Sequence, residues 1–400
     1  MTDEGLMRAS EGSVEAQLTA YERYCASLKA HRDGVRQRYA HFIGQPYLEL
    51  PTPALLLDLP TVRKNIATMA SRMRGRPAIR PHVKVHKSPD IARLQMGAGA
   101  VGVTCATVAE ALSMANAGLE DILIANEVLD PGKLRVLAEA ARLCRITVAV
   151  DSAAGAEALS AAAIHAGVDI GAVVEVDTGM GRGGVRTAEE ATQVGVHAAG
   201  LAGITVRGVT GWEGHVAAEP DRAIRAAGAA TAINKLVACA EALEVAGLNV
   251  EVISAGGTNT YDLTGTDRRV SDIQAGTYVL MDTSYSPFSP AFEPALSVLG
   301  MIVSRHEARA VADCGTKTMA VLLEPPQTRD GSAIVVEVHE EHALLDVSGR
   351  DRLREGDKVE LLVSYCAGTV NLHDAYFVVE DGRVIDVWPI EAARSGRVIQ

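Results

Sequence analysis

The stretch AIRPHVKVHKSPDIARLQMGAGAVGVTCATVAEA, residues 78–111, shows the pattern that decides the fold. Two short apolar runs are separated by a segment with helical spacing, and another such segment begins after the second run. Strands that alternate with helices in this way form a parallel sheet. Nine apolar runs of this kind follow one another along the chain, at residues 54–59, 78–84, 100–106, 121–126, 146–151, 172–177, 204–212, 250–257 and 277–282.

These runs predict a barrel followed by a different kind of domain. They are almost continuously apolar, as is typical of strands buried on both faces. Eight βα units close into a TIM-type (β/α)8 barrel, so one of the nine runs is surplus, and periodicity alone does not say which. After residue 290 the helical periodicity disappears and short strands with turn signals take over. We therefore expect an α/β barrel over residues 47–290 and an all-β domain over 291–400.

Residues 1–46 form a separate N-terminal arm in this interpretation. Apolar residues recur at helical spacing among charges over residues 13–40, which predicts an amphipathic helix. The segment FIGQPYLELPTP then ends the helix with Gly and Pro. The arm is expected to pack on the body of the protein or on a partner subunit, or simply to cap the domain.

The composition argues against several classes of protein. The chain has 50 acidic and 38 basic residues, whereas a nucleic-acid surface needs a basic stripe. No apolar run is long enough to span a membrane, and the acidic N-terminus does not resemble a secretory signal. The six cysteines are scattered without a CxxC pair, which favours reduced thiols in the cytoplasm.

Functional residues of such a barrel lie at the C-terminal ends of its strands, and Lys84 ends the run at 78–84. A lysine there is costly unless it is paired or functional, and a desolvated amine is suited to forming a Schiff base. The alternative is a side chain that reaches out at the rim of the barrel. Lys87 stands beside Ser88-Pro89 at the start of a helix, so we expect it to be solvated.

A second group of residues suits a phosphate. Gly256, Gly257 and Thr258 follow an apolar run and offer backbone N–H groups and a hydroxyl, although the same residues also suit a simple turn. A lysine and a phosphate site at one end of a barrel fit pyridoxal 5′-phosphate. Arg182, in the segment GMGRGG, is then a candidate partner for the pyridine nitrogen, or else a phosphate or surface arginine. Tyr285 follows the last run and is a further candidate for binding the cofactor.

Several segments resemble the D-threonine aldolase and D-serine dehydratase family of alanine-racemase-like, fold-type III pyridoxal-phosphate enzymes. They are TPALLLDL (52–59), RPHVKVHK (80–87), VEVDTGMGRGGV (174–185), SAGGTNTYD (254–262) and TVNLHDAYFVVEDG (369–382).

The resemblance implies that Lys84 binds the cofactor covalently, that His82 frames it and that Arg182 lies near its ring. It also implies that Gly256, Gly257 and Thr258 bind the phosphate. The run at 54–59 then belongs with the β domain, Lys84 ends the first barrel strand, and the protein is a homodimer in which the β domain of one chain faces the barrel of the other.

Two departures from the family pattern affect the predicted chemistry. Metal-dependent members have a His-x-Asp or His-x-Cys pair where this chain has Tyr365 and Ala367, and alanine cannot bind a metal. Glu213 follows Trp212 where aldolase relatives tend to carry a histidine after a tyrosine. We therefore expect no metal, with Glu213 as the general base and Tyr365 as a proton donor to the departing oxygen.

The predicted function is a lyase that cleaves or dehydrates a β-hydroxy D-amino acid or a close relative, using pyridoxal phosphate without a metal. A racemase or epimerase that uses Lys84 and Tyr365 on opposite faces of the substrate is the alternative. A third possibility is a pyridoxal-phosphate carrier without catalytic activity.

Overall fold

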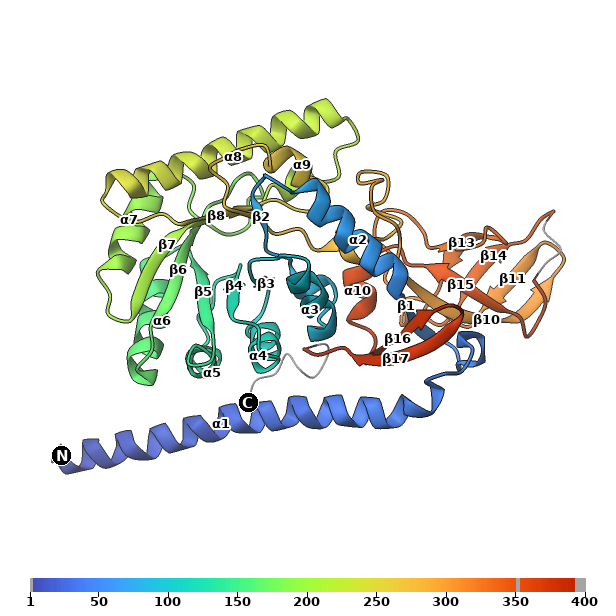
Figure 1. Ribbon diagram of the computed structural model, residues 1–400, viewed down its shortest axis with the longest axis horizontal. Helices are drawn as coiled ribbons and strands as arrows, with labels where there is room; N and C mark the ends of the chain where they lie inside the picture. The colour runs from blue at the N-terminus through green and yellow to red at the C-terminus, as the bar shows by residue number, and fades with distance from the viewer. Residues whose placement is uncertain (1–2, 350–352, 393–400) are drawn as a thin grey trace.

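The computed structural model describes residues 3–349 and 353–392, with side chains from residue 21 onward. Its larger part is a parallel sheet of eight strands in the order β2-β9-β8-β7-β6-β5-β4-β3, with helices around it (Figure 1). The strands are β2 (Ala78–Ile79), β3 (Val103–Cys105), β4 (Asp121–Ile124), β5 (Arg145–Val150), β6 (Ile170–Glu175), β7 (Ile204–Thr210), β8 (Val252–Ala255) and β9 (Asp272–Ile273).

The two edges of this sheet meet beyond β2. His82 forms a parallel bridge with Thr104, and the Thr104 N–H donates to the carbonyl of Pro81 over 2.8 Å. The sheet is thus joined into a barrel by irregular backbone, and the predicted barrel fold is confirmed. The helices that accompany it are α2 (Leu59–Arg72), α3 (Pro89–Gly97), α4 (Val108–Asn116), α5 (Pro131–Ala140), α6 (Ala153–Ala166), α7 (Ala188–Ala199), α8 (Arg222–Val245) and α9 (Tyr261–Thr264).

Most of these helices begin where the sequence supplies a capping residue. Proline occupies the first turn of α2, α3 and α5, where its missing N–H costs nothing. In each helix from α2 to α8, a capping side chain accepts a hydrogen bond from a backbone N–H of the first turn. The capping residues are Asp58, Ser88, Thr107, Asp130, Ser152, Thr187 and Asp221.

Two of the nine apolar runs are not barrel strands. Residues Ala54–Asp58 form β1, which pairs with strands of the other domain, as the resemblance implied. The run at 277–282 was expected to be a strand, but Thr277–Val279 is the 3-10 helix η5. The eighth barrel strand is instead β9, only two residues long, whose Asp272 is buried and polar.

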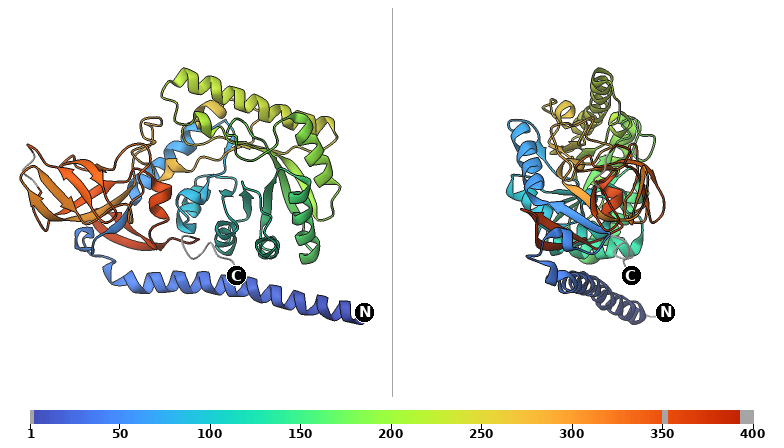
Figure 2. Two further views of the ribbon diagram at one scale, coloured as in Figure 1. Left: turned by 180° about the vertical axis from the view of Figure 1, so that it is seen from behind. Right: turned by 90° about the vertical axis from the view of Figure 1, so that its right-hand side faces the viewer.

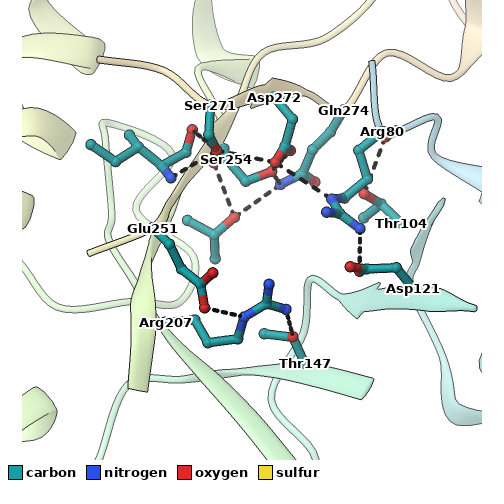
Figure 3. A network of polar contacts seen from close by, with 12 residues as sticks. Arg80, Thr104, Asp121, Thr147, Arg207, Glu251, Ser254, Ser271, Asp272 and Gln274 are labelled. Carbon is teal, nitrogen blue, oxygen red and sulfur yellow. Dashed lines mark hydrogen bonds and ion pairs between the residues drawn. The ribbon is translucent and has the colours of Figure 1, made fainter. Parts of the chain in front are cut away.

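Ion pairs inside the barrel explain why β9 lacks an apolar pattern (Figure 3). Arg80 lies 2.6 Å from Asp121 and 3.5 Å from Asp272. Arg207 lies 2.9 Å from Glu251 and donates to Thr147. Each buried guanidinium is thus matched by a carboxylate, which offsets the cost of removing it from water. Part of the barrel interior is therefore polar, and a hydrophobic pattern does not reveal the strands that line it.

The second domain is a sheet of nine strands at one end of the barrel (Figure 1). Its main path is β13-β14-β11-β10-β1-β16-β17, while β15 pairs with β10 and β12. The elements are β1 (Ala54–Asp58), β10 (Leu296–His306), β11 (Arg309–Ala312), β12 (Gln327–Thr328), β13 (Ile334–Val338), β14 (Ala343–Asp346), β15 (Lys358–Leu362), β16 (Ala375–Glu380), β17 (Arg383–Pro389) and the short helix α10 (Cys366–Val370). Helix α10 packs against the 3-10 helix η3 (Val83–Val85), which carries Lys84.

The arm contains one long helix, α1 (Asp3–Tyr39), that lies along the outside of the barrel helices (Figures 1 and 2). Tyr24 and Leu28 are buried against the barrel, and the Tyr24 hydroxyl donates to the carbonyl of Ala109. Two 3-10 helices, η1 (Ala40–Phe42) and η2 (Tyr47–Glu49), lead from α1 to β1. From residue 21 onward the arm therefore packs on the body of its own chain. None of the described helices combines the length and apolar character needed to cross a membrane.

Candidate active site

A pocket opens where the C-terminal ends of the barrel strands face the β domain. It brings together eight of the predicted site residues, which are His82, Lys84, Arg182, Gly256, Gly257, Thr258, Tyr285 and Tyr365. Ala367 also lines it. Glu213 is the one predicted site residue outside this lining.

Lys84 lies in η3, beyond the end of β2 rather than at the strand end itself. In the described part of the chain its amine has no hydrogen-bonding or carboxylate partner, and it lies 5.3 Å from the centre of the Trp212 ring. Burial, and then the charge of Arg182, lower the pKa of Lys84. A lysine held in this way is more readily uncharged, as a nucleophilic amine must be.

His82 holds the start of the Lys84 turn. Its Nδ1 accepts a hydrogen bond from the backbone N–H of Lys84 over 3.5 Å. Burial, followed by the charge of Lys84, lowers the pKa of His82 well below its ordinary value, so the ring is neutral. The ring therefore supports the turn and adds no charge to the pocket.

Lys87 is buried, and the expectation that it is solvated was wrong. Only 3% of the residue is exposed, and its amine forms an ion pair with Glu110 and also donates to the carbonyl of Ala392. The chain turns inward here because Lys87 itself adopts a left-handed backbone with φ of 48°. The ion pair fixes the loop to α4, which carries Glu110.

In the glycine-rich loop after β8, the backbone N–H groups of the two glycines are already bonded within the protein and are not free to bind a phosphate. The Gly256 N–H is bound by Glu213, and the Gly257 N–H by the Thr260 hydroxyl, so neither matches the free donor that we expected. A Cβ on Gly257 would lie 2.9 Å from Nε1 of Trp212. The Thr258 hydroxyl accepts from the N–H of Tyr278 and keeps its own proton to donate.

Glu213 is not placed to act on a substrate. The residue is fully buried, and its two oxygens accept hydrogen bonds from the Gly256 N–H and the Thr264 hydroxyl. Each oxygen thus accepts a hydrogen bond within the protein, and the residue lies outside the pocket lining. This placement supports the loop after β8 and does not favour the predicted role of Glu213 as the general base.

The β domain contributes Tyr365 and Ala367 through the start of α10. Asp282 connects this wall to the barrel, because its carboxylate accepts from the backbone N–H groups of Tyr285 and Cys366 at 2.9 and 3.0 Å. Burial raises the pKa of Asp282 to about 6, although these hydrogen bonds oppose the shift. Burial also raises the pKa of Tyr365, so its phenol is a proton donor at neutral pH.

Sequence reasoning missed several polar residues of the pocket, among them Gln274 and Glu175. The Gln274 amide donates to the hydroxyls of Thr210 and Ser254, both at 2.9 Å (Figure 3). Gln274 directly follows β9, so it escaped notice together with that strand. Glu175 is the last residue of β6 and part of a run that was recognised, but a carboxyl within an apolar run gave no signal of its own.

The fold and this pocket define an alanine-racemase-like barrel with a lysine-centred site. The family model for the N-terminal domain of alanine racemase matches residues 57–283, and a serine dehydratase domain model matches residues 295–379. The chain therefore belongs to the D-threonine aldolase and D-serine dehydratase family of alanine-racemase-like pyridoxal-phosphate enzymes, and the resemblance read from the sequence is confirmed.

Individual relatives agree with this assignment. The chain is 34% identical to the D-threonine aldolase of Arthrobacter sp, with 88% of this chain and 96% of the relative covered. It is 33% identical to the 3-hydroxy-D-aspartate aldolase of Paracoccus denitrificans (strain Pd 1222), covering 88% and 95%. The crystal structure of D-threonine aldolase from Filomicrobium marinum superposes with a TM-score of 0.84 at 32% identity, covering 88% of this chain and 98% of that one.

Proposed function

We propose that this protein is a pyridoxal-phosphate-dependent lyase that cleaves or dehydrates a β-hydroxy D-amino acid without a metal ion. The observation that carries the proposal is the unpaired, partly desolvated amine of Lys84, which shares its pocket with the loop after β8. Aldolases among the relatives support C–C cleavage, and the serine dehydratase domain match supports loss of water.

The residues present fit the cofactor. Lys84 would hold its aldehyde carbon, and Thr258 would donate to its phosphate from the loop after β8. A Cβ on Gly276 would come within 2.7 Å of the His82 carbonyl, so the lack of a side chain lets this pocket-lining residue pack closely against the turn that carries Lys84. When bound, pyridoxal phosphate withdraws electrons from the bonds at the substrate's α-carbon.

Which bond of the substrate breaks then depends on the proton donors and acceptors that the protein places beside it. Tyr365 retains its proton and lies in the β-domain wall, so it donates to the oxygen that departs or changes charge at the β-carbon. Lys84, with its lowered pKa, accepts and returns a proton at Nζ. Glu213 acts through the loop after β8, because it is fully buried, lies outside the pocket lining and accepts from Gly256 in that loop and from Thr264 in α9.

The donor set at the position of the family's metal pair does not suit a divalent ion. Ala367 has no ligating atom, and a neutral phenol such as that of Tyr365 is a poor ligand. Nearby, a ring nitrogen of His373 is 2.7 Å from the carbonyl of Thr318. We infer that hydrogen bonding from Tyr365 takes over the polarisation of the β-oxygen that a metal provides elsewhere in the family.

We also propose that the protein is a cytoplasmic homodimer. All six cysteines are unpaired thiols, which suits a reducing compartment. Three consecutive apolar residues next to the pocket, Val321, Leu322 and Leu323, are between 43% and 55% exposed. Their backbone is tied to Ser284 and Ser364, which adjoin the pocket residues Tyr285 and Tyr365. A second subunit on this segment would cover the mouth of the pocket.

A product assay with and without EDTA tests the proposed reaction. D-isomers of β-hydroxy amino acids are expected to give an aldehyde with glycine, or a keto acid with ammonia, at rates that EDTA does not change. Appearance of the enantiomer alone would support the racemase instead. Activity that is lost to EDTA and restored by Mn²⁺ or Zn²⁺ would refute the metal-free mechanism.

Two substitutions test the roles of individual residues in this reaction. Lys84→Ala is expected to abolish the adduct that borohydride traps between protein and cofactor. Tyr365→Phe is expected to lower kcat by about 10²- to 10⁴-fold, the usual cost of losing a positioned acid, while the spectrum of the bound cofactor persists. Trapping at Lys87 would contradict the first assignment, and an unchanged kcat would contradict the second.

A further inference from the structure

Beside Arg182, the pocket residue Glu175 interacts with a second carboxyl group, that of Glu127. Glu175 ends β6, and Glu127 lies shortly after β4. Glu175 is 8% exposed, and its Oε1 is 3.7 Å from Nη2 of Arg182. The Arg182 side chain lines the same pocket and is 55% exposed. Arg182 therefore forms an ion pair with Glu175, while more than half of its side chain remains accessible to a ligand in the pocket.

One oxygen of each carboxyl lacks a hydrogen-bond donor. Within the described residues, Glu127 Oε1 and Glu175 Oε2 are buried and accept from no protein group. The two side chains nonetheless interact, since burial and then the neighbouring Glu127 raise the pKa of Glu175. Ionised carboxylates only accept hydrogen bonds. The contact is therefore favourable when one of the two groups carries a proton between them.

The surroundings keep this proton in place at moderate pH. Burial, and then the neighbouring Glu127, raise the pKa of Glu175 to about 7, and Asp151 adds to this shift while Arg182 opposes it. Asp151 itself accepts from the Gly184 N–H, at the end of the loop formed by residues 179–184. A Cβ on Gly183 would lie 3.4 Å from Glu127 Oε1, so this loop covers the carboxyl pair.

We propose that Glu127 and Glu175 share one proton and that losing it draws Arg182 toward the carboxyls and away from the bound cofactor. The pair carries one negative charge with the proton and two without it. The 3.7 Å separation is longer than a charge-assisted hydrogen bond of about 2.8 Å, so Arg182 has room to approach. Both glutamates are thus positioning residues that act through Arg182. The inference rests on the proposed function, because the ligand is pyridoxal phosphate.

Glu175→Gln imitates the protonated state and gives a sharp comparison. The dissociation constant of pyridoxal phosphate is measured by fluorescence titration of the cofactor-free full-length protein, at about pH 6 and about pH 8. Near pH 6 the variant should match the wild type, since Glu175 is then neutral in both. Near pH 8 the variant should bind at least about fivefold more tightly, because only the wild type has lost the shared proton. Ionisation of the cofactor and of Lys84 affects both proteins alike.

Glu127→Gln limits the pair to one negative charge from the other side. An amide in place of Glu127 removes the neighbouring charge and can donate to Glu175, so the pair never carries the second charge that draws Arg182 away. This variant should bind like the wild type near pH 6, where each pair carries one charge, and more tightly near pH 8, where only the wild type carries two. Glu189→Gln, on the exposed first turn of α7, is the matched control and should leave binding unchanged at both pH values.

The outcomes separate this inference from the proposed function. Equal binding by the wild type and Glu175→Gln at both pH values would overturn the shared-proton mechanism. An equal loss of cofactor affinity in Glu175→Gln at both pH values would also overturn it, because such a loss marks a purely structural residue. In an Arg182→Gln background, the pH-dependent effect of Glu175→Gln should vanish, and its persistence would show that Arg182 is not involved. A wild-type protein that does not bind pyridoxal phosphate would overturn both the proposed function and this inference.

Discussion

Glu213 and Glu175 are the same residue type at the ends of neighbouring barrel strands, but their surroundings give them different chemistry. Glu213 accepts from two donors, a backbone N–H and a hydroxyl, one on each of its oxygens. Glu175 faces another carboxyl with one oxygen left unsatisfied, which favours its protonated form. Proximity to a strand end is therefore a weak guide to catalysis, whereas the balance of donors and acceptors around each oxygen is informative.

Glu213→Gln should weaken cofactor binding with little effect on kcat once the cofactor is saturating. The amide oxygen can accept from the Gly256 N–H only if the Thr264 hydroxyl reorients to accept from the amide N–H, so the hydrogen bond that Thr264 donates is lost at a cost of about 1–3 kcal/mol. The loop after β8 should then lose its fixed shape. Cofactor titration, followed by kinetics at saturating cofactor, measures both effects.

Thr264→Val is the matched variant, because it removes the partner hydroxyl and should give the same phenotype. A fall in kcat of about 10²-fold or more in Glu213→Gln at saturating cofactor, with Thr264→Val unaffected, would instead restore Glu213 as the base.

Among the elements, helix α1 is connected to the loop that carries Lys84. Arg32 on α1 forms an ion pair with Glu391 at 2.8 Å, and only 2% of the Glu391 side chain is exposed. The backbone N–H of Glu391 donates to the carbonyl of Lys87 over 2.9 Å. The segment after β17 thus lies between α1 and the Lys84–Lys87 loop and contacts both. We infer that the arm stabilises this loop in addition to covering the barrel.

Arg32→Ala is expected to lower the free energy of unfolding by about 1–3 kcal/mol, since it leaves a buried carboxylate with the Ser113 hydroxyl as its remaining side-chain partner. Hydrogen exchange of peptides that contain residues 84–90 should become faster at the same time. Denaturant titration and exchange measured by mass spectrometry report the two effects.

Lys29→Ala serves as the control, because Lys29 pairs with Asp33 on the solvent side of the same helix, where an ion pair contributes little. Equal effects of the two substitutions would show that α1 does not act on the loop through Glu391.

At the scale of the whole molecule, most of the fold was predictable because it depends on repeated patterns. Apolar runs that alternate with segments of helical spacing indicated the barrel, and the loss of helical periodicity indicated the β domain. Strand β9 was missed because a two-residue strand with a buried, ion-paired Asp272 has no apolar pattern. Lys87 and Glu213 were misjudged because their partners, Glu110 and Thr264, are supplied by tertiary structure. The domain boundaries at residues 46 and 290 stay predictions.

The last prediction concerns assembly and follows from the exposed segment Val321–Leu323 beside the pocket. Contiguous apolar side chains on a protein surface usually mark a contact with another molecule. We expect a homodimer by light scattering at micromolar concentration. The double substitution Leu322→Asp and Leu323→Asp should shift it toward monomer by placing charges in the contact, and should raise KM because the mouth of the pocket is then uncovered.

Val245→Asp is the control for this experiment, since Val245 is 90% exposed at the end of α8, an element of the barrel's outer layer. It should change neither mass nor KM. A wild-type monomer with full activity would show that one chain forms a complete site by itself. A dimer that the two aspartates leave intact would place the contact on another face, and the apolar segment would then have to serve the substrate directly.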